Sequence, residues 1–142
     1  MKQLTNKQFI SVYSLVPRLC VEVIILTKDG IVLTKRNIEP AKGYWHLPGG
    51  TVLKGERLKK AVQRIARQET GLNVKVDKLL GIIEYSFKNY FASAVGVAFQ
   101  TSVKSGQQKH DRNADEIATF KKLPAKMIVA QKSFIKNHLD FI

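Results

Sequence analysis

The sequence predicts a mixed α/β sandwich, in which strands surround one central helix and a second helix closes the chain. Three observations support this fold class. Residues 18–27 are rich in β-branched side chains, and Lys28-Asp29-Gly30 forms a hairpin turn into an apolar run at 31–35. Within residues 56–69, apolar side chains recur at the spacing of an amphipathic helix. Three later segments are predicted as strands: 74–86, 91–103 and 116–123.

Glycine and proline set the expected boundaries of the helices. Gly71 directly follows the central helix, where a left-handed residue commonly ends a helix. Pro124 is expected to open the last helix, whose apolar residues are Met127, Phe134, Ile135, Leu139 and Ile142. Residues 39–50 contain two prolines and three glycines, so we expect a loop there with a short strand at most.

Length and composition indicate a single globular domain over residues 1–142. No apolar run approaches the ~20 residues that span a bilayer, and the first residues lack the apolar stretch of a secretion signal. The single cysteine, Cys20, excludes an internal disulfide and a multi-cysteine zinc site. We therefore expect a cytoplasmic protein with no membrane partner.

The net charge of +13 favours polyanionic partners, such as nucleotides, phosphorylated metabolites or RNA. The basic residues are scattered, however, with only short pairs such as Lys59-Lys60 and Lys121-Lys122. This pattern favours a solvated lysine-rich surface over a dedicated nucleic-acid stripe.

The segment 43–72 carries the main functional pattern, because a glycine-rich loop leads there into a helix. Gly49 and Gly50 allow the backbone to approach a ligand closely and to turn a carbonyl toward a cation. Glu69 shares its helical face with three apolar side chains: Leu58, Val62 and Ile65. A carboxylate on an inward face must be paired, hydrogen-bonded or metal-bound. Alternatively, Glu69 escapes to solvent at the helix end or pairs with a neighbouring arginine.

Residues 50–72 resemble the Nudix box, G-x5-E-x7-R-E-U-x-E-E-x-G-U, where U is a bulky aliphatic residue. The matching positions are held by Gly50, Glu56, Arg64, Ala66, Glu69, Gly71 and Leu72. The preceding GYWHLPGG resembles the usual lead-in to that box. The resemblance implies a Nudix-type α/β/α sandwich with a mixed sheet, in which the box forms a loop–helix–loop. It also implies hydrolysis of a nucleoside diphosphate linked to another moiety, with Mg2+ or Mn2+ as cofactor.

The box departs from the family at two of its three metal-binding carboxylates, since Ile65 and Gln68 stand where the family has acids. Only Glu69 remains ionisable. We therefore expect few bound ions, held by Glu69, the Gly49 carbonyl and the oxygens of the substrate phosphates. Glu56, Arg64 and Gly71 are expected to have structural roles.

Outside the box, the chain has the opening Leu4…Phe9…Pro17, then Lys35-Arg36, Pro40-Ala41 and GYWxxPGG. Over residues 1–72 it thereby resembles the GDP-mannose mannosyl hydrolase branch, which also retains only the final box glutamate. By this resemblance Glu22 and Arg36 contact the substrate, and Gly50 lies in the same binding site. Glu22 also interrupts an otherwise apolar strand, which favours a functional or paired carboxylate over a solvent-exposed strand end. Arg36 is either a bidentate phosphate clamp or an ordinary surface arginine.

Two regions differ from that branch. The branch has an arginine after PGG that supports the departing diphosphate, whereas this chain has Thr51. The late loop offers His110 as a candidate base, although its spacing does not match the branch. Instead, the segment 115–118 resembles the acidic segment of ordinary Nudix enzymes, so Glu116 is the preferred second catalytic and metal-binding acid. Both residues could instead be ordinary loop residues.

Two hypotheses about function remain open at this point. In the first, the protein hydrolyses an NDP-linked small molecule, with an NDP-sugar such as GDP-mannose as the leading candidate. In the second, it is a Nudix module that binds nucleotide or RNA with little or no turnover. Homodimers are common among relatives, so a second copy of the chain is a further candidate partner.

Overall fold

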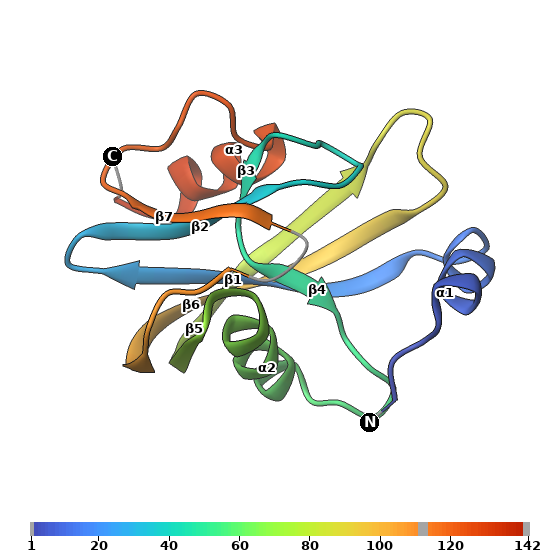
Figure 1. The fold of residues 1–142 in the computed structure, drawn as a ribbon, viewed down its shortest axis with the longest axis horizontal. Helices are drawn as coiled ribbons and strands as arrows, with labels where there is room; N and C mark the ends of the chain where they lie inside the picture. The colour runs from blue at the N-terminus through green and yellow to red at the C-terminus, as the bar shows by residue number, and fades with distance from the viewer. Residues whose placement is uncertain (1, 111–113, 141–142) are drawn as a thin grey trace.

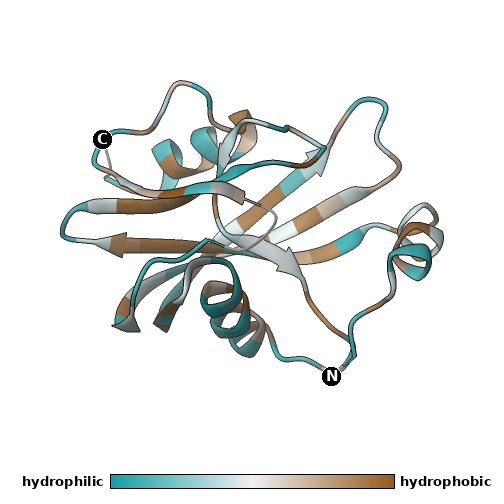
Figure 2. Ribbon diagram, in the orientation of Figure 1, coloured by the Kyte–Doolittle hydropathy of each residue, from teal (hydrophilic) through white to brown (hydrophobic). Residues whose placement is uncertain are grey.

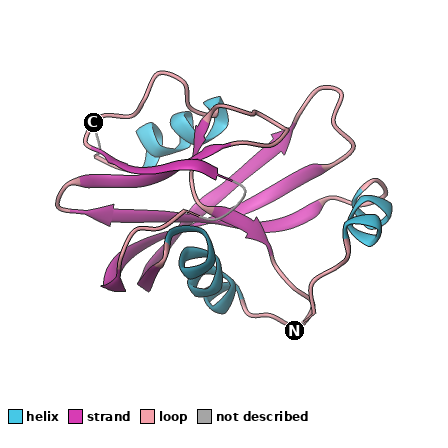
Figure 3. Ribbon diagram, viewed as in Figure 1, coloured by secondary structure: helices cyan, strands magenta, loops and turns pink. Residues whose placement is uncertain are grey.

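The computed structural model describes residues 2–110 and 114–140, which form a mixed sheet with helices on both faces (Figure 1). The elements, in chain order, are α1 (Asn6–Tyr13), β1 (Arg18–Thr27), β2 (Gly30–Arg36), β3 (Trp45–His46), β4 (Gly49–Thr51), α2 (Leu58–Thr70), β5 (Leu72–Ser86), β6 (Ser93–Gly106), β7 (Ala114–Phe120) and α3 (Val129–His138). This confirms the predicted α/β class (Figure 3). No helix among these residues is long and apolar enough to cross a membrane.

The sheet has seven strands, in the order β3-β2-β1-β6-β5, with β4 added beside β1 and β7 beside β2. Strand β1 pairs with β6 in parallel over residues 18–26. Its other edge is shared, because β4 pairs with residues 20–22 and β2 pairs only with Leu26 and Thr27. Strand β2 therefore diverges from β1 where β4 begins. We call this divergence of β2 and β4 along one side of β1 the fork.

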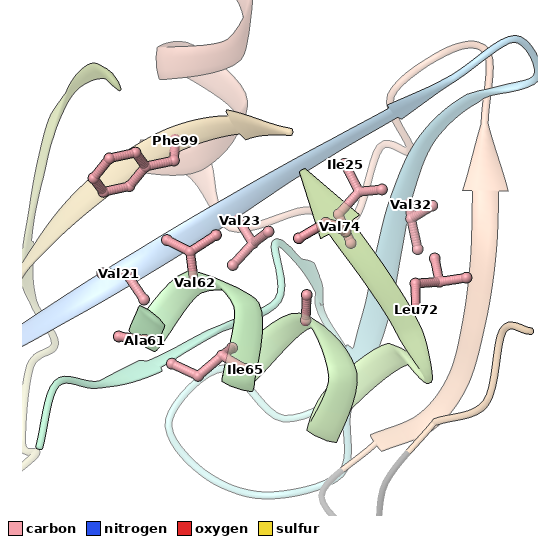
Figure 4. Packing of buried hydrophobic residues seen from close by; sticks show 11 residues of the cluster. Val21, Val23, Ile25, Val32, Ala61, Val62, Ile65, Leu72, Val74 and Phe99 are labelled. Carbon is pink, nitrogen blue, oxygen red and sulfur yellow. The ribbon is translucent and has the colours of Figure 1, made fainter. Parts of the chain in front are cut away.

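Strand β1 is buried on both faces, because successive side chains point to opposite sides of a strand. Val21, Val23 and Ile25 pack against α2, while Ile24 packs in the second core beneath α3. Figure 4 shows the first of these cores. In Figure 2 the central strands are largely brown, whereas α2 is largely teal. Glu22 lies between Val21 and Val23 and therefore points to the α3 side of the sheet.

Most predicted elements are confirmed, including the first hairpin, the central helix and the three later strands, with small shifts in their ends. Gly71 has φ 75°, so the left-handed end of α2 is also confirmed. An alanine Cβ at Gly71 would overlap the carbonyl oxygen of Gln107. Glycine is therefore required there by both the backbone conformation and the close approach of the neighbouring loop.

One predicted helix start was wrong, and one helix was not predicted. The last helix begins at Val129 rather than at Pro124, because the preceding segment pairs with β3: Trp45 N–H donates to the Lys126 carbonyl and Ile128 N–H donates to the Trp45 carbonyl. Ile142, expected on that helix, lies outside the described residues. The sequence analysis also assigned no element to α1, a helix with a Thr5–Gln8 capping box and no buried residue.

Candidate active site

A half-open cavity of about 1190 Å³ lies where β2 and β4 diverge along β1. Its charged lining includes both signs: Lys2, Arg18, Arg36, Lys54 and Arg64, with Glu22, Glu39 and Glu69. Its aromatic lining comes from α1, from the end of β5 and from the β5–β6 connection: Phe9, Tyr13, Tyr85, Phe87, Tyr90 and Phe91. Such a lining suits a ligand with both phosphate groups and flat rings.

Glu69, near the C-terminal end of α2, lies beside Gly49 and Gly50 at the start of β4, a pair that we call the glycine turn. The backbone N–H of Gly49 donates to Glu69 Oε1 at 3.4 Å. Along β4, hydrogen bonds to β1 flank this position, from Val23 N–H to the Pro48 carbonyl and from Val52 N–H to the Leu19 carbonyl. Because hydrogen-bonded pairs alternate in an antiparallel ladder, the N–H and C=O of Gly49 both face away from β1.

The two substituted box positions lie close to this carboxylate. Ile65 is 2% exposed, and its Cδ1 would be 3.1 Å from a Cβ at Gly50, so the side chain fills the space beneath the turn. Gln68 is exposed, and its Oε1 accepts a hydrogen bond from Arg64 Nη1 at 3.1 Å. Ile65 therefore cannot supply a ligand, and the Gln68 carbonyl is already engaged.

Glu56 and Arg64 connect the loop before α2 to the helix itself. Arg64 Nε and Nη2 donate to the two carboxylate oxygens of Glu56, at 2.7 and 2.9 Å. Arg64 Nη2 also donates to the Thr51 carbonyl at 3.0 Å, and Leu53 N–H donates to Glu56. The hydrogen bonds from Arg64 lower the pKa of Glu56. These contacts fit the structural role that we expect for the pair.

Glu22 occupies a slot between two glycines on the strands flanking β1. It is 6% exposed, and a Cβ on Gly49 or Gly96 would overlap its side chain. Burial raises the pKa of Glu22 from 4.5 to about 8, against the opposing effects of a Tyr85 hydrogen bond and the Arg18 and Arg36 charges. The buried carboxyl lines the cavity and is not a solvent-exposed strand end.

A chain of hydrogen bonds runs from Leu47, between β3 and β4, to Glu22. Leu47 N–H donates to Gln131 Oε1 at 2.7 Å, which fixes the amide of this buried α3 side chain. The Gln131 amide nitrogen then donates to the Tyr85 hydroxyl oxygen at 3.0 Å, and the Tyr85 hydroxyl donates to Glu22. Sequence reasoning identified neither Tyr85 nor Gln131.

The raised pKa of Glu22 predicts a pH-dependent stability in the metal-free protein. A carboxyl with a pKa of about 8 when folded, against 4.5 ordinarily, retains a proton that the unfolded chain has lost. Its stabilising contribution is complete below pH 4.5 and is lost as the pH rises toward 8, with a limiting slope of about 1.4 kcal/mol per pH unit. Urea unfolding at several pH values should show this fall in the wild type and a flatter dependence in Glu22→Gln. Equal pH dependence in the two proteins would contradict the prediction.

Arg36 comes from the end of β2 and is partly buried in the cavity wall. Its Nε donates to the Pro40 carbonyl at 2.6 Å, and burial lowers its pKa while the nearby Glu69 charge raises it. The neighbouring His46 is buried and its Nε2 lies 3.0 Å from the Thr34 hydroxyl. Burial and the Arg36 charge lower the pKa of His46 to about 3, so the imidazole is neutral at physiological pH.

Arg18, which the sequence analysis did not single out, lies over Thr51. Its Nε and Nη2 both lie within hydrogen-bonding distance of the Thr51 hydroxyl oxygen, at 3.2 and 2.8 Å. Its guanidinium carbon is 4.9 Å from the centre of the Phe9 ring and 5.9 Å from that of Tyr13. The guanidinium group of Arg18 therefore lies directly beside the side chain of Thr51.

The structure does not bring Glu116 or His110 into the cavity that Glu22, Arg36 and Glu69 line. Glu116 pairs with Lys35 across β2 and β7 at 3.5 Å, and its side chain is 58% exposed. His110 is exposed, and neither residue belongs to the described cavity lining. The side chain of Asp115 lies outside the described residues. The roles of Glu116 and His110 stay predictions. That of Glu116 is supported by sequence resemblance, whereas His110 is a candidate only because it lies in the late loop.

The oxygen atoms beside the glycine turn fit a hard divalent cation. The Glu69 carboxylate accepts a hydrogen bond from the Gly49 N–H, and the Glu22 carboxyl lies against Gly49 from the other side. The Gly49 carbonyl is free of the β1 ladder. The described residues contain no group of three His, Cys, Asp or Glu side chains arranged for a metal. A cation here would therefore need oxygens from water and substrate, as Mg2+ commonly does in phosphate-binding sites.

Comparison with known proteins agrees with this geometry. The NUDIX domain family matches residues 16–142. The chain is similar to an ADP-ribose pyrophosphatase from Methanocaldococcus jannaschii, with 32% identity over 97% of this chain and 83% of the relative. It is also similar to the low-salt glycan biosynthesis protein Agl8 from Haloferax volcanii, with 31% identity over 74% of this chain and 71% of the relative.

Among solved structures, a MutT NUDIX hydrolase from Burkholderia pseudomallei has the same fold, with a TM-score of 0.78 and 24% identity over 85% of this chain and 97% of that one. The overall fold of this chain thus occurs in a known structure. The chain belongs to the Nudix family.

Proposed function

We propose that this chain hydrolyses a nucleoside diphosphate linked to a second moiety, with an NDP-sugar such as GDP-mannose as the leading candidate. The observation that carries the proposal is the position of the Glu69 carboxylate against the Gly49 N–H, at the edge of a large cavity. Family membership and the relative named as an ADP-ribose pyrophosphatase support the NDP-linked class. The glycan-related relative supports a sugar as the second moiety.

In this proposal Glu69 and the Gly49 carbonyl would hold Mg2+, or Mn2+, together with oxygens of the substrate diphosphate. When bound, such a cation would supply positive charge against the negative charge of the diphosphate. Arg36 binds phosphate, and Glu22 accepts hydrogen bonds from the substrate beside Gly50. Glu116 and His110 remain the candidates for the general base. We further propose that the enzyme acts in the cytoplasm.

A screen of the purified protein tests this function. NDP-sugars, dinucleotides, NTPs and capped RNA are incubated with Mg2+ or Mn2+, and release of phosphate or sugar is measured. We expect turnover of at least one NDP-linked compound and none without a divalent cation. Turnover in 18O-labelled water then locates the attack, because label appears in the phosphate after attack at phosphorus and in the sugar after attack at carbon.

The second candidate function is a Nudix module that binds nucleotide or RNA without turnover. Two observations favour it: Ile65 replaces a family carboxylate with a buried apolar side chain, and the Gln68 carbonyl is engaged by Arg64. The net charge of +13 also suits a polyanion. Tight, salt-sensitive RNA binding, with no hydrolysis of any compound in the screen, would support this function over the first.

A further inference from the structure

We propose that Arg18 is an anion-binding residue of the cavity and that it binds the diphosphate of the substrate. The inference rests on the proposed function for the identity of the anion, but the site itself is argued from geometry. Arg18 lines the cavity, and β1 places it next to the glycine turn, since Cys20 pairs with Thr51 and Val21 pairs with Gly50.

The Arg18 guanidinium is held in place by neutral groups. The Thr51 hydroxyl oxygen accepts from two of its nitrogens, Nε and Nη2. Its Cζ atom lies over the Phe9 ring, 4.9 Å from the ring centre. The Arg64 contact to the Thr51 carbonyl fixes the residue that provides this hydroxyl. The side chain is thus oriented before any ligand arrives, which reduces the entropy lost on binding.

The charge of Arg18 is not neutralised by direct contact with a carboxylate in the described part of the chain. The ion pairs found there are Lys35–Glu116 and Arg64–Glu56. Glu22 is close enough for the Arg18 charge to affect its pKa, but burial keeps the pKa of Glu22 high. A partly buried cation with neutral partners at a cavity wall attracts an anion, and a guanidinium fork matches phosphate oxygens.

The helix α1 takes part in this arrangement. It precedes residues 16–142, which match the family domain, and it supplies the two aromatic rings beside Arg18. The opposite interpretation is that Arg18 serves only to attach α1 to the sheet. The two roles differ in their consequences: attachment affects the stability of α1, whereas anion binding affects the affinity for a phosphate ligand.

Binding of inorganic pyrophosphate with Mg2+, measured by isothermal titration calorimetry, tests the proposal without requiring turnover. Arg18→Met should weaken binding at least ~10-fold, because a hydrogen-bonded charge contact is lost. Arg18→Lys should recover little, since an ammonium cannot reproduce the fork and the ring contact. Thr51→Val keeps the side-chain shape and should weaken binding several-fold. Arg57→Met, which removes an exposed arginine at the start of α2, is the matched control and should bind normally.

Steady-state kinetics on the substrate found in the screen give a second readout. If Arg18 binds diphosphate equally in ground and transition states, Arg18→Met should raise KM about 10-fold and leave kcat within about threefold. Pyrophosphate binding within twofold of the wild type in Arg18→Met, or an equal loss in Arg57→Met, would overturn the proposal. Detachment of α1, detected by proteolysis within residues 6–13, with unchanged pyrophosphate affinity would establish the attachment role instead.

The same measurements separate this inference from the proposed function. Arg18-dependent pyrophosphate binding without turnover of any NDP compound would remove the hydrolase and leave the anion site standing. Turnover with the same KM in the wild type and in Arg18→Met would support the hydrolase and contradict the proposed role of Arg18.

Discussion

Replacing Glu69 with glutamine is expected to lower kcat/KM for the NDP-linked substrate at least ~100-fold, because it removes the only ionisable side chain left among the three metal-binding positions of the box. The amide keeps the size of the side chain and can still contact the Gly49 N–H, which donates to Glu69 Oε1 at 3.4 Å. The loss should therefore come from weakened cation binding and not from altered packing. Kinetics across a range of Mg2+ concentrations would show a raised requirement for the cation.

Glu84→Gln is a suitable control, because it makes the same change at an exposed position on β5. It should leave both the activity and the Mg2+ requirement unchanged. Near-normal turnover in Glu69→Gln would refute the proposed role of this carboxylate.

The second large effect is expected from Gly96→Ala, which places a methyl group in the slot that holds Glu22. The new Cβ would lie 2.8 Å from Glu22 Cγ and Oε1, too close for the side chain to stay in place. Because a buried carboxyl has few other positions, we expect ~1–3 kcal/mol lower stability from overpacking. We also expect at least ~10-fold lower kcat/KM, from displacement of a group proposed to contact substrate. Thermal or urea unfolding and steady-state kinetics measure the two losses.

A double-mutant cycle identifies the cause of this effect. In a Glu22→Ala background the crowded side chain is absent, so Gly96→Ala should cost much less stability than it does alone. Additive losses would show that Gly96 acts through the backbone or another neighbour. Gly49→Ala would also crowd Glu22, but the Gly49 peptide is itself a proposed cation ligand, so Gly96 gives the cleaner test.

The sequence was sufficient for the elements whose signals are local. The central helix, its left-handed end at Gly71 and the first hairpin each depend on residues that are near one another in the chain. Helical spacing placed Glu69 on the same face as Leu58, Val62 and Ile65 but left its exposure open, and the side chain is half-buried. The burial of Glu22 followed from the apolar residues on both sides of it in β1. These two carboxylates were thus identified before any tertiary contact was known.

The rest of the site depends on contacts between distant segments. Gly96 is needed because parallel pairing brings β6 beside β1, and nothing near it in the sequence indicates that pairing. Gln131 was not singled out in the sequence, yet its amide contacts Leu47, 84 residues earlier in the chain, and Tyr85, 46 residues earlier. Arg18 begins a strand and would ordinarily face solvent, but α1 and Thr51 enclose it. The sequence did show that Thr51 stands where the resembling branch has an arginine, but it gave no indication that Arg18 lies beside Thr51.

The contact between Gln131 and Leu47 also bears on how the protein is made. Leu47, two residues before Gly49, emerges from the ribosome early, but the Gln131 amide that accepts its N–H hydrogen bond lies 84 residues later. Until translation has passed α3, the Tyr85 hydroxyl also lacks the donor that orients it. The contacts of Gln131 with Leu47 and Tyr85 can therefore form only after the C-terminal helix has left the exit tunnel.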